Sequence, residues 1–329
     1  MKPFTCAIIG ATGMVGGMFL KILEERKLPI SQLYLFASSR SAGKKVTFCG
    51  REIDVEELAP SVFDRGIDFA LFGADAETGK KYAPIAAANG CVVVDNSSAW
   101  RMDSTVPLCV PEVNAADLQN HKGIIANPNC CAVPAVVALK PLLDAYGLER
   151  IIISTYQSVS GAGVGGMADL AHTLAGQAPQ YFPYPIGGNL IPHIDVFHDD
   201  GYTGEEKKLM AEVQKILNRP NLPITATTVR VPVEYGHSLA INVSLAKEFA
   251  IEDVRKILAA SPGIVLQDNT AKNLYPMPLA AAGTDQVYVG RLRRDNSFPN
   301  TLNMWVVADN TRKGAATNAV QIVESLQGF

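Results

Sequence analysis

Short apolar runs alternate with helix-like segments through the first third of the chain. Runs such as FTCAIIG and CVVVDN are rich in β-branched or aromatic side chains, which is typical of buried strands. The pattern predicts strands over residues 4–10, 32–38, 68–74 and 91–96, and helices over residues 14–26 and 78–90. Because strands that alternate with helices at this spacing form βαβ units, we expect a parallel sheet with crossover helices.

The pattern changes after residue 130. Helices are predicted over residues 134–147, 204–217 and 312–327, and strands over residues 150–161, 224–233, 239–245 and 301–308. Strands that follow one another without an intervening helix favour a mixed or antiparallel sheet. The chain is therefore predicted to be an α/β protein whose second half is a separate α+β domain.

The composition fits such a globular protein of two domains. The chain has 329 residues, of which 48% are hydrophobic and 19% are charged, and its formal net charge is -3. No basic block is present, so nucleic acid is not expected as a partner. No apolar stretch reaches the roughly 18 residues that a membrane helix needs, so no membrane association is expected either.

The use of cysteine predicts a reducing, cytoplasmic environment. The six cysteines have neither CxxC spacing nor the density of a disulfide framework. The N-terminal stretch is interpreted as strand and loop rather than as a signal peptide. Glycines interrupt its apolar run, and no small-residue cleavage site follows.

A glycine-rich loop follows the first predicted strand. In GATGMVG, Gly10, Gly13 and Gly16 are spaced as GxxGxxG, a variant of the dinucleotide fingerprint. Glycines let a pyrophosphate approach the backbone next to the positive end of the first helix. The alternative is a tight turn, but the strand–loop–helix context favours a dinucleotide site.

The loop after the second predicted strand favours NADP over NAD. An NAD site has an acidic residue about 20 residues past the glycine loop. Here LYLFA ends without an acid and runs into SSRSAGKK, residues 38–45. Hydroxyl groups and cations suit a 2′-phosphate, and Arg40 is the best single candidate because its planar guanidinium can hold two phosphate oxygens.

Two adjacent cysteines open the helix predicted after NPN. Pro128 favours an extended Asn127, and Asn129 is a good N-cap. Cys130 is therefore expected in the first helical turn, where free backbone N–H groups lower a thiol pKa. Cys131 is expected to point away into packing. The alternative is that both cysteines are structural.

A histidine and an arginine accompany these thiols. RVPVEYGHS places Arg230 and His237 around the end of a strand, and TYQSVSGAG follows another strand and ends in a flexible glycine turn. A thiolate, an imidazole and a guanidinium are the groups that acyl transfer on an anionic substrate needs.

Five motifs together resemble the aspartate-semialdehyde dehydrogenase family. They are NPNC, TYQSVSGAG, YTGEEKKLMAEVQKIL, RVPVEYGHS and VADNTRKGAATNAVQI, and they occur in the family's order and with its spacings. The likeness extends from the glycine loop to the C-terminal helix. It implies reversible, NADPH-dependent reduction of aspartyl phosphate to aspartate semialdehyde and inorganic phosphate, within lysine, threonine and methionine biosynthesis.

The resemblance also implies the roles of the catalytic residues. Cys130 matches the nucleophile that forms the thiohemiacetal and the thioester. His237 matches the acid/base, and Gln157 matches the residue that orients the acyl intermediate.

Substrate contacts are implied in the same way. Arg230 matches the arginine that binds the α-carboxylate, and Arg101 matches a phosphate-binding arginine. Glu205 faces the substrate amine and Lys208 the phosphate side, three residues apart on one helix. Asn129 completes the implied substrate site.

The implied cofactor contacts lie in four motifs. They are Gly10, Thr12, Gly13, Met14, Val15, Ser38, Arg40, Ser41, Ser160, Gly161 and Asn310. The implied domains are a Rossmann-like NADP-binding domain, residues 1–127 with 310–329, and a catalytic and dimerisation domain, residues 128–309. The implied assembly is a homodimer or a tetramer.

The chain departs from the family at GADAETG, residues 73–79, which lacks the usual serine- and glycine-rich turn beside the cofactor. A second stretch, PHIDVFHDD, carries His193 and His198, but these histidines lack helical ligand spacing, and no metal is expected.

Two alternative functions stay open. One is the related reductase that acts on N-acetyl-glutamyl phosphate, against which the Glu205/Lys208 helix argues. The other is an inactive relative that serves as a binding protein, against which the presence of both Cys130 and His237 argues.

Overall fold

The computed structural model describes residues 2–328, which form two compact units. The first unit contains the described residues up to Pro128 together with those from Ala315 onward, and the second contains Asn129–Gly314. The chain therefore leaves the first unit once and returns to it with its last helix. Within residues 2–328, no helix is both long and apolar enough to cross a membrane.

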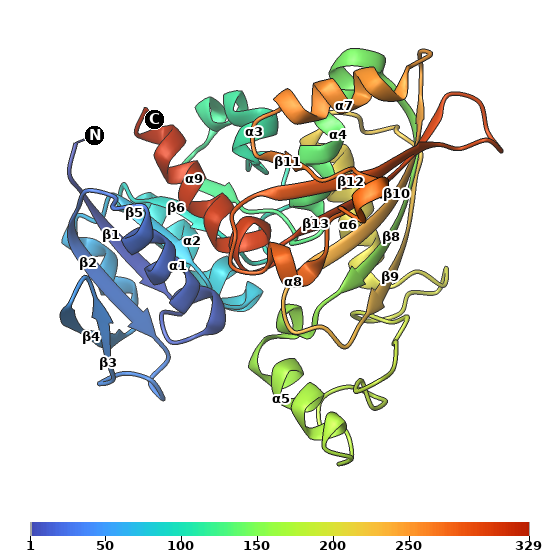
Figure 1. Cartoon of the computed structure of the whole chain (residues 1–329). Helices are drawn as coiled ribbons and strands as arrows, with labels where there is room; N and C mark the ends of the chain where they lie inside the picture. The colour runs from blue at the N-terminus through green and yellow to red at the C-terminus, as the bar shows by residue number, and fades with distance from the viewer. Residues whose placement is uncertain (1, 329) are drawn as a thin grey trace. The chain divides into compact units, whose positions relative to one another are not determined.

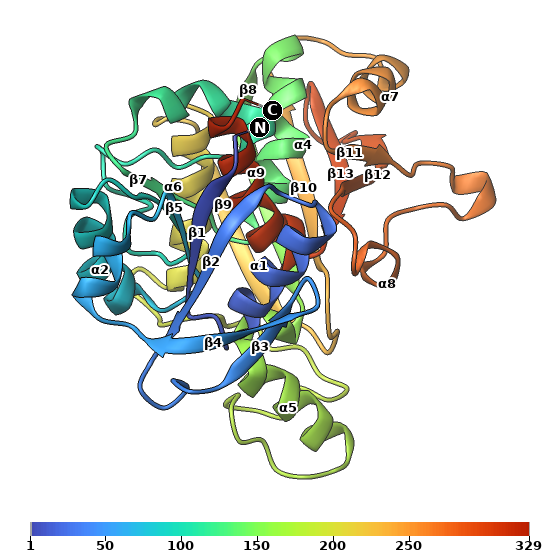
Figure 2. The ribbon, with the colours of Figure 1, turned by 90° about the vertical axis from the view of Figure 1, so that its left-hand side faces the viewer.

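The first unit is built on a seven-stranded sheet with the order β3-β4-β2-β1-β5-β6-β7. Its strands are β1 (Phe4–Ile9), β2 (Ile30–Ala37), β3 (Lys45–Phe48), β4 (Arg51–Glu57), β5 (Phe69–Phe72), β6 (Val92–Asp95) and β7 (Ile124–Ala126). Neighbours are parallel, except that β3 and β4 form an antiparallel hairpin at one edge (Figures 1 and 2). The strand order reverses at β1, so ligands are expected at its carboxyl end.

Helices cover both faces of this sheet. They are α1 (Met14–Glu25), α2 (Ala76–Ala88), α3 (Pro111–Asn114) and α9 (Thr317–Leu326), with 3₁₀ helices over Pro60–Arg65 and Ala115–Asn120. On one face, Ile8 shares an apolar core with Phe19 of α1 and Val320 of α9. On the other face, Ile9 packs in a core with Phe63. Because successive side chains of a strand point to opposite faces, both faces of β1 are covered, and all its residues except Thr5 are apolar.

The second unit is built on a six-stranded sheet with the order β11-β12-β13-β10-β8-β9. Its strands are β8 (Leu148–Gln157), β9 (Ile224–Arg230), β10 (His237–Leu245), β11 (Ile264–Leu266), β12 (Val287–Arg294) and β13 (Thr301–Ala308). Two pairs, β8–β9 and β11–β12, are parallel and the other pairs are antiparallel. The sheet is therefore mixed, as the sequence predicts.

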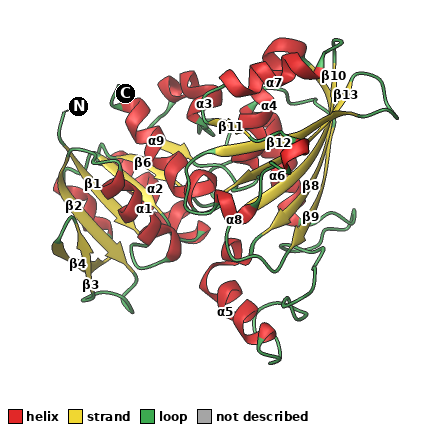
Figure 3. Cartoon of the chain, in the orientation of Figure 1, coloured by secondary structure: helices red, strands yellow, loops and turns green. Residues whose placement is uncertain are grey.

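Helices lie mainly against one face of this second sheet (Figure 3). The helices are α4 (Ala132–Tyr146), α5 (Gly163–Leu174), α6 (Gly204–Ile216), α7 (Ile251–Ala260) and α8 (Pro278–Ala281), with 3₁₀ helices over Val159–Ala162 and Thr270–Lys272 and a π-helical turn over Arg312–Ala316. Contacts join α4 to β10, β12 and β13, α6 to β9, and α7 to β11 and β12. Alternate side chains of β8 and β13, including Tyr156 and Trp305, are only half-buried.

The predicted fold class is confirmed, with corrections in detail. The sheet of the first unit is not wholly parallel, because β3 returns along β4. The strand predicted over residues 150–161 ends at Gln157. The glycine turn expected at the end of TYQSVSGAG opens helix α5 instead. That helix is tied to the following segment, since the Asp169 carboxylate accepts N–H bonds from Gln180 and Phe182 at 2.6 and 2.9 Å.

Candidate active site

The turn before α4 holds the candidate nucleophile. The sequence predicted Cys130 in the first turn of the helix. Helix α4 begins only at Ala132, so Cys130 lies in the turn that precedes it. The N-cap residue is Cys131 and not Asn129, although Asn129 Oδ1 still accepts the N–H of Cys131 at 2.8 Å and that of Ala132 at 3.4 Å. The N–H of Asn129 itself donates to Glu212 Oε2 at 2.6 Å. The turn is thus held at both ends.

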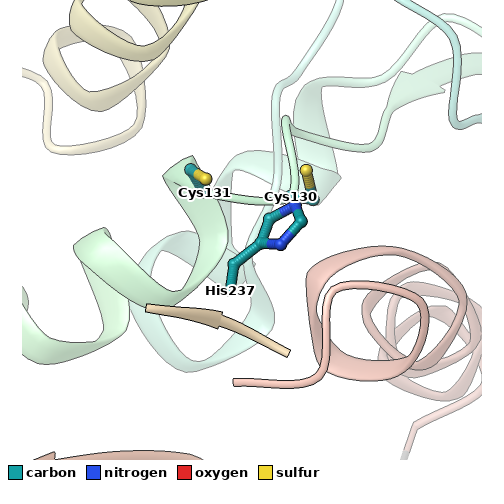
Figure 4. A group of neighbouring side chains, drawn as sticks. All are labelled: Cys130, Cys131 and His237. Carbon is teal, nitrogen blue, oxygen red and sulfur yellow. The ribbon is translucent and has the colours of Figure 1, made fainter. Parts of the chain in front are cut away.

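Cys130, Cys131 and His237 lie together in the second unit (Figure 4). Their sulfur atoms and one imidazole nitrogen all lie within 4.8 Å of one another. His237 is the first residue of β10, whereas the two thiols come from the turn before α4. Cys130 is half-buried, while Cys131 and His237 are inaccessible to solvent.

The two thiols have opposite pKa shifts. A hydrogen bond from Cys131, together with the charges of His237 and Arg230, holds the pKa of Cys130 well below its usual value, although burial opposes this. Burial and the bond to Cys130 raise the pKa of Cys131 well above its usual value. Cys130 is therefore the thiolate and Cys131 the thiol that donates to it. Cys131 is buried, as expected, but its sulfur lies within 4.8 Å of that of Cys130, and its hydrogen bond is the largest cause of the lowered pKa of Cys130.

The His237 ring is held through its Nδ1 atom. The N–H of Ser158 donates to Nδ1 at 3.1 Å, and the Ser158 hydroxyl lies 3.0 Å from the same atom. The other ring nitrogen, Nε2, is buried and has no hydrogen-bond partner within residues 2–328. Gly161 leaves room for the ring, because a Cβ there would lie 3.1 Å from Nε2.

Parallel pairing of β8 and β9 brings Gln157 and Arg230 opposite each other at the ends of their strands. Arg230 is buried, and one of its Nη atoms donates to the carbonyl oxygen of Ser158 at 2.7 Å. Its Nε has no hydrogen-bond partner within residues 2–328. Burial lowers the pKa of Arg230, while the charges of Cys130 and Glu205 act in the opposite direction. A buried guanidinium with an unused donor is suited to an anionic ligand.

Glu205 of α6 connects the remaining polar residues. Its Oε1 accepts a bond from Asn129 Nδ2 at 2.8 Å and one from Gln157 Nε2 at 3.1 Å. Gln157 is oriented in turn by Thr155, whose hydroxyl donates to Gln157 Oε1 at 3.0 Å. The structure thus brings the predicted residues Asn129, Gln157 and Glu205 into one buried network.

Two other predicted substrate residues have the following contacts. Lys208 of α6 pairs with Asp195, with 2.5 Å between Nζ and Oδ2. Arg101 belongs to the first unit, where its Nη2 donates to the carbonyl oxygen of Asn96 at 2.8 Å.

A cavity of about 510 Å³ lies in the first unit at the carboxyl end of β1. Its lining includes Gly10, Thr12 and Gly13 of the glycine loop and Ser38 and Arg40 of the loop after β2. Of the other predicted contacts in this unit, Met14 and Val15 begin α1, and Ser41 closes the β2 loop by donating its N–H to the carbonyl oxygen of Ser38 at 2.9 Å.

The glycine loop is shaped by close backbone contacts. Gly10 has a φ of +81°, and a Cβ there would lie 3.0 Å from the carbonyl group of Gly73. A Cβ on Gly16 would lie 2.2 Å from the Gly10 carbonyl oxygen. Side chains are excluded at both positions, so the backbone and the N-terminus of α1, which has no acidic residue in its first turn, face the cavity.

The remaining predicted cofactor contacts lie in the second unit. Ser160 and Asn310 are buried and bonded to each other, with Asn310 Nδ2 donating to Ser160 Oγ at 3.0 Å. Asn310 Oδ1 also accepts the N–H of Gly236 at 3.0 Å. Gly161 lies beside His237 and Arg230.

The roles of several residues of the two sites were not predicted from the sequence. They are Cys131 as a hydrogen-bond donor, Ser158 as a partner of His237, Glu212 as an acceptor from Asn129, Gly314 and Glu57. A Cβ on Gly314 would lie 3.0 Å from the Cys130 carbonyl oxygen. Glu57 ends β4, pairs in register with Ala37 and lines the cavity of the first unit. No local pattern signals these roles, because each depends on contacts with a distant or adjacent segment.

The described residues contain one group of three side chains with metal-ligand geometry, and it is Cys130, Cys131 and His237 itself. The two histidines of PHIDVFHDD are not part of such a group within residues 2–328. His193 instead stacks on Phe197, with 4.2 Å between ring centroids.

The fold and the site define a class of enzyme. A dinucleotide-type unit and an α+β unit with a thiolate beside an imidazole are the parts of a semialdehyde dehydrogenase. Residues 5–121 match the family model described as semialdehyde dehydrogenase, NAD binding domain. Residues 139–313 match the model described as semialdehyde dehydrogenase, dimerisation domain.

Relatives narrow this class. The aspartate-semialdehyde dehydrogenase of Aquifex aeolicus is 52% identical over 98% of each chain, and that of Bacillus subtilis is 46% identical over 98% of this chain and 96% of its own. The chain belongs to the aspartate-semialdehyde dehydrogenase family, which confirms the resemblance seen in the five motifs.

Solved structures agree with this assignment. Aspartate semialdehyde dehydrogenase II of Vibrio cholerae matches with a TM-score of 0.94 and 45% identity over 99% of each chain. The same enzyme has also been solved complexed with ASA. The enzyme of Candida albicans, solved with NADP, matches with a TM-score of 0.78 and 27% identity over 99% of each chain.

Proposed function

We propose that this enzyme reduces L-aspartyl-4-phosphate to L-aspartate-4-semialdehyde with NADPH, reversibly, through a thioester on Cys130. The observation that carries the proposal is the half-buried Cys130 sulfur, with its lowered pKa, beside Cys131 and His237. A thiolate is the nucleophilic form of cysteine. The ASA complex of the Vibrio cholerae relative supports the choice of substrate.

In the reductive direction the Cys130 thiolate attacks the acyl carbon, and inorganic phosphate leaves to give the thioester. The nicotinamide, when bound, would supply the hydride that reduces the thioester carbon. His237 gives a proton to the oxygen of the resulting thiohemiacetal and takes it back as the carbon–sulfur bond breaks, which releases the aldehyde and the thiolate. Gln157, held by Thr155 and Glu205, orients the acyl oxygen.

Charged side chains select the substrate in this proposal. Arg230 binds the α-carboxylate, which its unused Nε donor supports. The Glu205 carboxylate, which already accepts bonds from Asn129 and Gln157, receives the substrate ammonium. Lys208 and Arg101 serve the phosphate.

The residues around the cavity of the first unit fit a dinucleotide, and we assign it to NADP. The glycine loop receives the pyrophosphate, while Arg40 and Ser38 receive the 2′-phosphate. The Candida albicans complex with NADP supports this choice. Glu57 lines the same cavity, and its negative charge opposes a 2′-phosphate, so Arg40 must outweigh it.

The proposed assembly is a homodimer or a pair of such dimers, formed by the second unit in the cytoplasm. The matching model for this unit is described as a dimerisation domain. The proposed pathways are the lysine, threonine and methionine branches of biosynthesis, including diaminopimelate.

The test is NADP reduction by aspartate semialdehyde in the presence and absence of inorganic phosphate. Turnover is expected only with phosphate, and Cys130→Ala is expected to abolish it. N-acetylglutamate semialdehyde is the comparison substrate, because it lacks the free amine that Glu205 receives. Faster turnover of that substrate, or turnover that Cys130→Ala leaves intact, would contradict the proposal.

A further inference from the structure

The backbone N–H and the side-chain hydroxyl of Ser158 both lie within hydrogen-bond distance of Nδ1 of His237. The backbone N–H of Ser158 lies 3.1 Å from Nδ1, and the Ser158 hydroxyl lies 3.0 Å from it. Ser158 is inaccessible to solvent, and its own carbonyl oxygen is held by Arg230 at 2.7 Å. Water therefore does not replace either contact.

The backbone contact selects one form of neutral His237. A backbone N–H can only donate, so Nδ1 must accept and cannot carry a proton while that bond is made. The single proton of the neutral ring is then on Nε2, the nitrogen directed toward Cys130 (Figure 4). In this form His237 can donate a hydrogen bond to the thiolate, but its Nε2 has no lone pair with which to accept a proton.

Acid/base catalysis at Nε2 needs a different form. Nε2 can accept and release a proton only when Nδ1 keeps its own proton throughout. The Ser158 N–H opposes a protonated Nδ1, because the two donors face each other. The Ser158 hydroxyl oxygen is the acceptor that can receive the Nδ1 proton, at 3.0 Å.

The Ser158 hydroxyl has hydrogen-bond partners besides His237. Asn310 Oδ1 lies 2.9 Å from Ser158 Oγ, and Ser160 Oγ lies 3.1 Å from it. The orientation of Asn310 is fixed, since its Oδ1 accepts the N–H of Gly236 and its Nδ2 donates to Ser160 Oγ, both at 3.0 Å. A chain of hydrogen bonds thus runs from protonated Nδ1 through Ser158 to Asn310.

We propose that Ser158 is a positioning residue that controls which nitrogen of His237 carries a proton. Its peptide N–H favours the Nε2-protonated form whenever the ring is neutral. Its hydroxyl, backed by Asn310, keeps the Nδ1-protonated ring accessible, so that Nε2 can give a proton to the thiohemiacetal oxygen and take it back in reverse. This inference rests on the proposed acid/base role of His237.

The first test is Ser158→Ala, which keeps the peptide N–H and removes the hydroxyl. General acid/base catalysis contributes about 10²–10⁴-fold, so we expect kcat to fall at least about 10-fold. KM values for aspartate semialdehyde and phosphate are expected to stay within about twofold, because Ser158 is inaccessible to solvent. Ser154→Ala is the matched control, since Ser154 lies within β8 and pairs in register with Ala240, not with His237.

The second test measures directly which ring nitrogen of His237 is protonated. Nitrogen-15 NMR of labelled histidine distinguishes protonated from unprotonated ring nitrogens, and His237→Asn identifies the signals of His237 among the five histidines. Neutral His237 is expected to be protonated at Nε2 in the wild type and in Ser158→Ala. This measurement needs no turnover, so it tests the role of the Ser158 N–H even if the chain fails to oxidise aspartate semialdehyde.

Three results would overturn the inference. They are a neutral wild-type His237 protonated at Nδ1, a Ser158→Ala enzyme whose kcat stays within about twofold of wild type, and a loss confined to KM. A Ser158→Ala protein with an unchanged melting temperature, a reduced kcat and an Nε2-protonated ring supports it.

Discussion

Replacing Cys131 with alanine removes the thiol that donates a hydrogen bond to the Cys130 thiolate. That bond is the largest of the effects that lower the pKa of Cys130. A hydrogen bond to a charged group contributes about 1.5–3 kcal/mol. Since about 1.4 kcal/mol corresponds to a factor of ten, the thiolate population at a pH below the pKa should fall about 10- to 150-fold.

The sign of the Cys130 pKa shift determines how its reactivity changes with pH. A lowered pKa keeps Cys130 in the thiolate form at a lower pH than an ordinary thiol, so losing the donor moves the whole profile to higher pH. Cys131→Ala should therefore react more slowly than the wild type below the pKa of the variant and match it at higher pH. Reactivity that was lost through unfolding of the variant would not return at higher pH.

The assay is the rate of alkylation by iodoacetamide as a function of pH, followed on the Cys130 peptide by mass spectrometry. Peptide resolution is needed because Cys49 is exposed and will also react. Cys131→Ser is the matched control, since its hydroxyl can still donate to the thiolate. If the Cys131→Ala profile coincides with that of the wild type, or if Cys131→Ser shifts just as far, the hydrogen-bond argument is wrong.

Three further outcomes are expected. His237→Asn should lower kcat about 100-fold or more while KM changes little, because proton transfer belongs to the transition state; a change confined to KM in steady-state kinetics would contradict this. Arg230→Leu should raise KM for the semialdehyde and Arg101→Leu should raise KM for phosphate, each by about 10-fold or more, and equal effects on both substrates would refute the assignment. Arg40→Ala should raise KM for NADP and leave that for NAD nearly unchanged, whereas Glu57→Gln should lower KM for NADP; comparable use of both cofactors by the wild type would argue against the NADP assignment.

Local patterns in the sequence determined the element types and the chemistry of the site. The period of apolar residues distinguishes the buried β1 from the amphipathic α1, because each period matches one backbone geometry. The need for glycine at position 16 could also be predicted from the local sequence, since the residue that it contacts, Gly10, is only six positions earlier in the chain. The identity of Cys130 and His237 followed from motifs that carry their own spacing.

Tertiary structure alone decided the arrangement of the site. Helix α5 forms in a glycine-rich stretch, and Asp169 ties it to the backbone of the segment that follows. Ser158 meets Asn310 across 152 residues of sequence, because β8 and β13 flank β10 in one sheet. The sulfur atoms of Cys130 and Cys131 lie within 4.8 Å of each other in a turn before α4, where the sequence predicted a helix. Hydrophobic periodicity encodes which face of an element is buried, whereas hydrogen bonds between distant segments depend on sheet register and on turns, which no local pattern specifies.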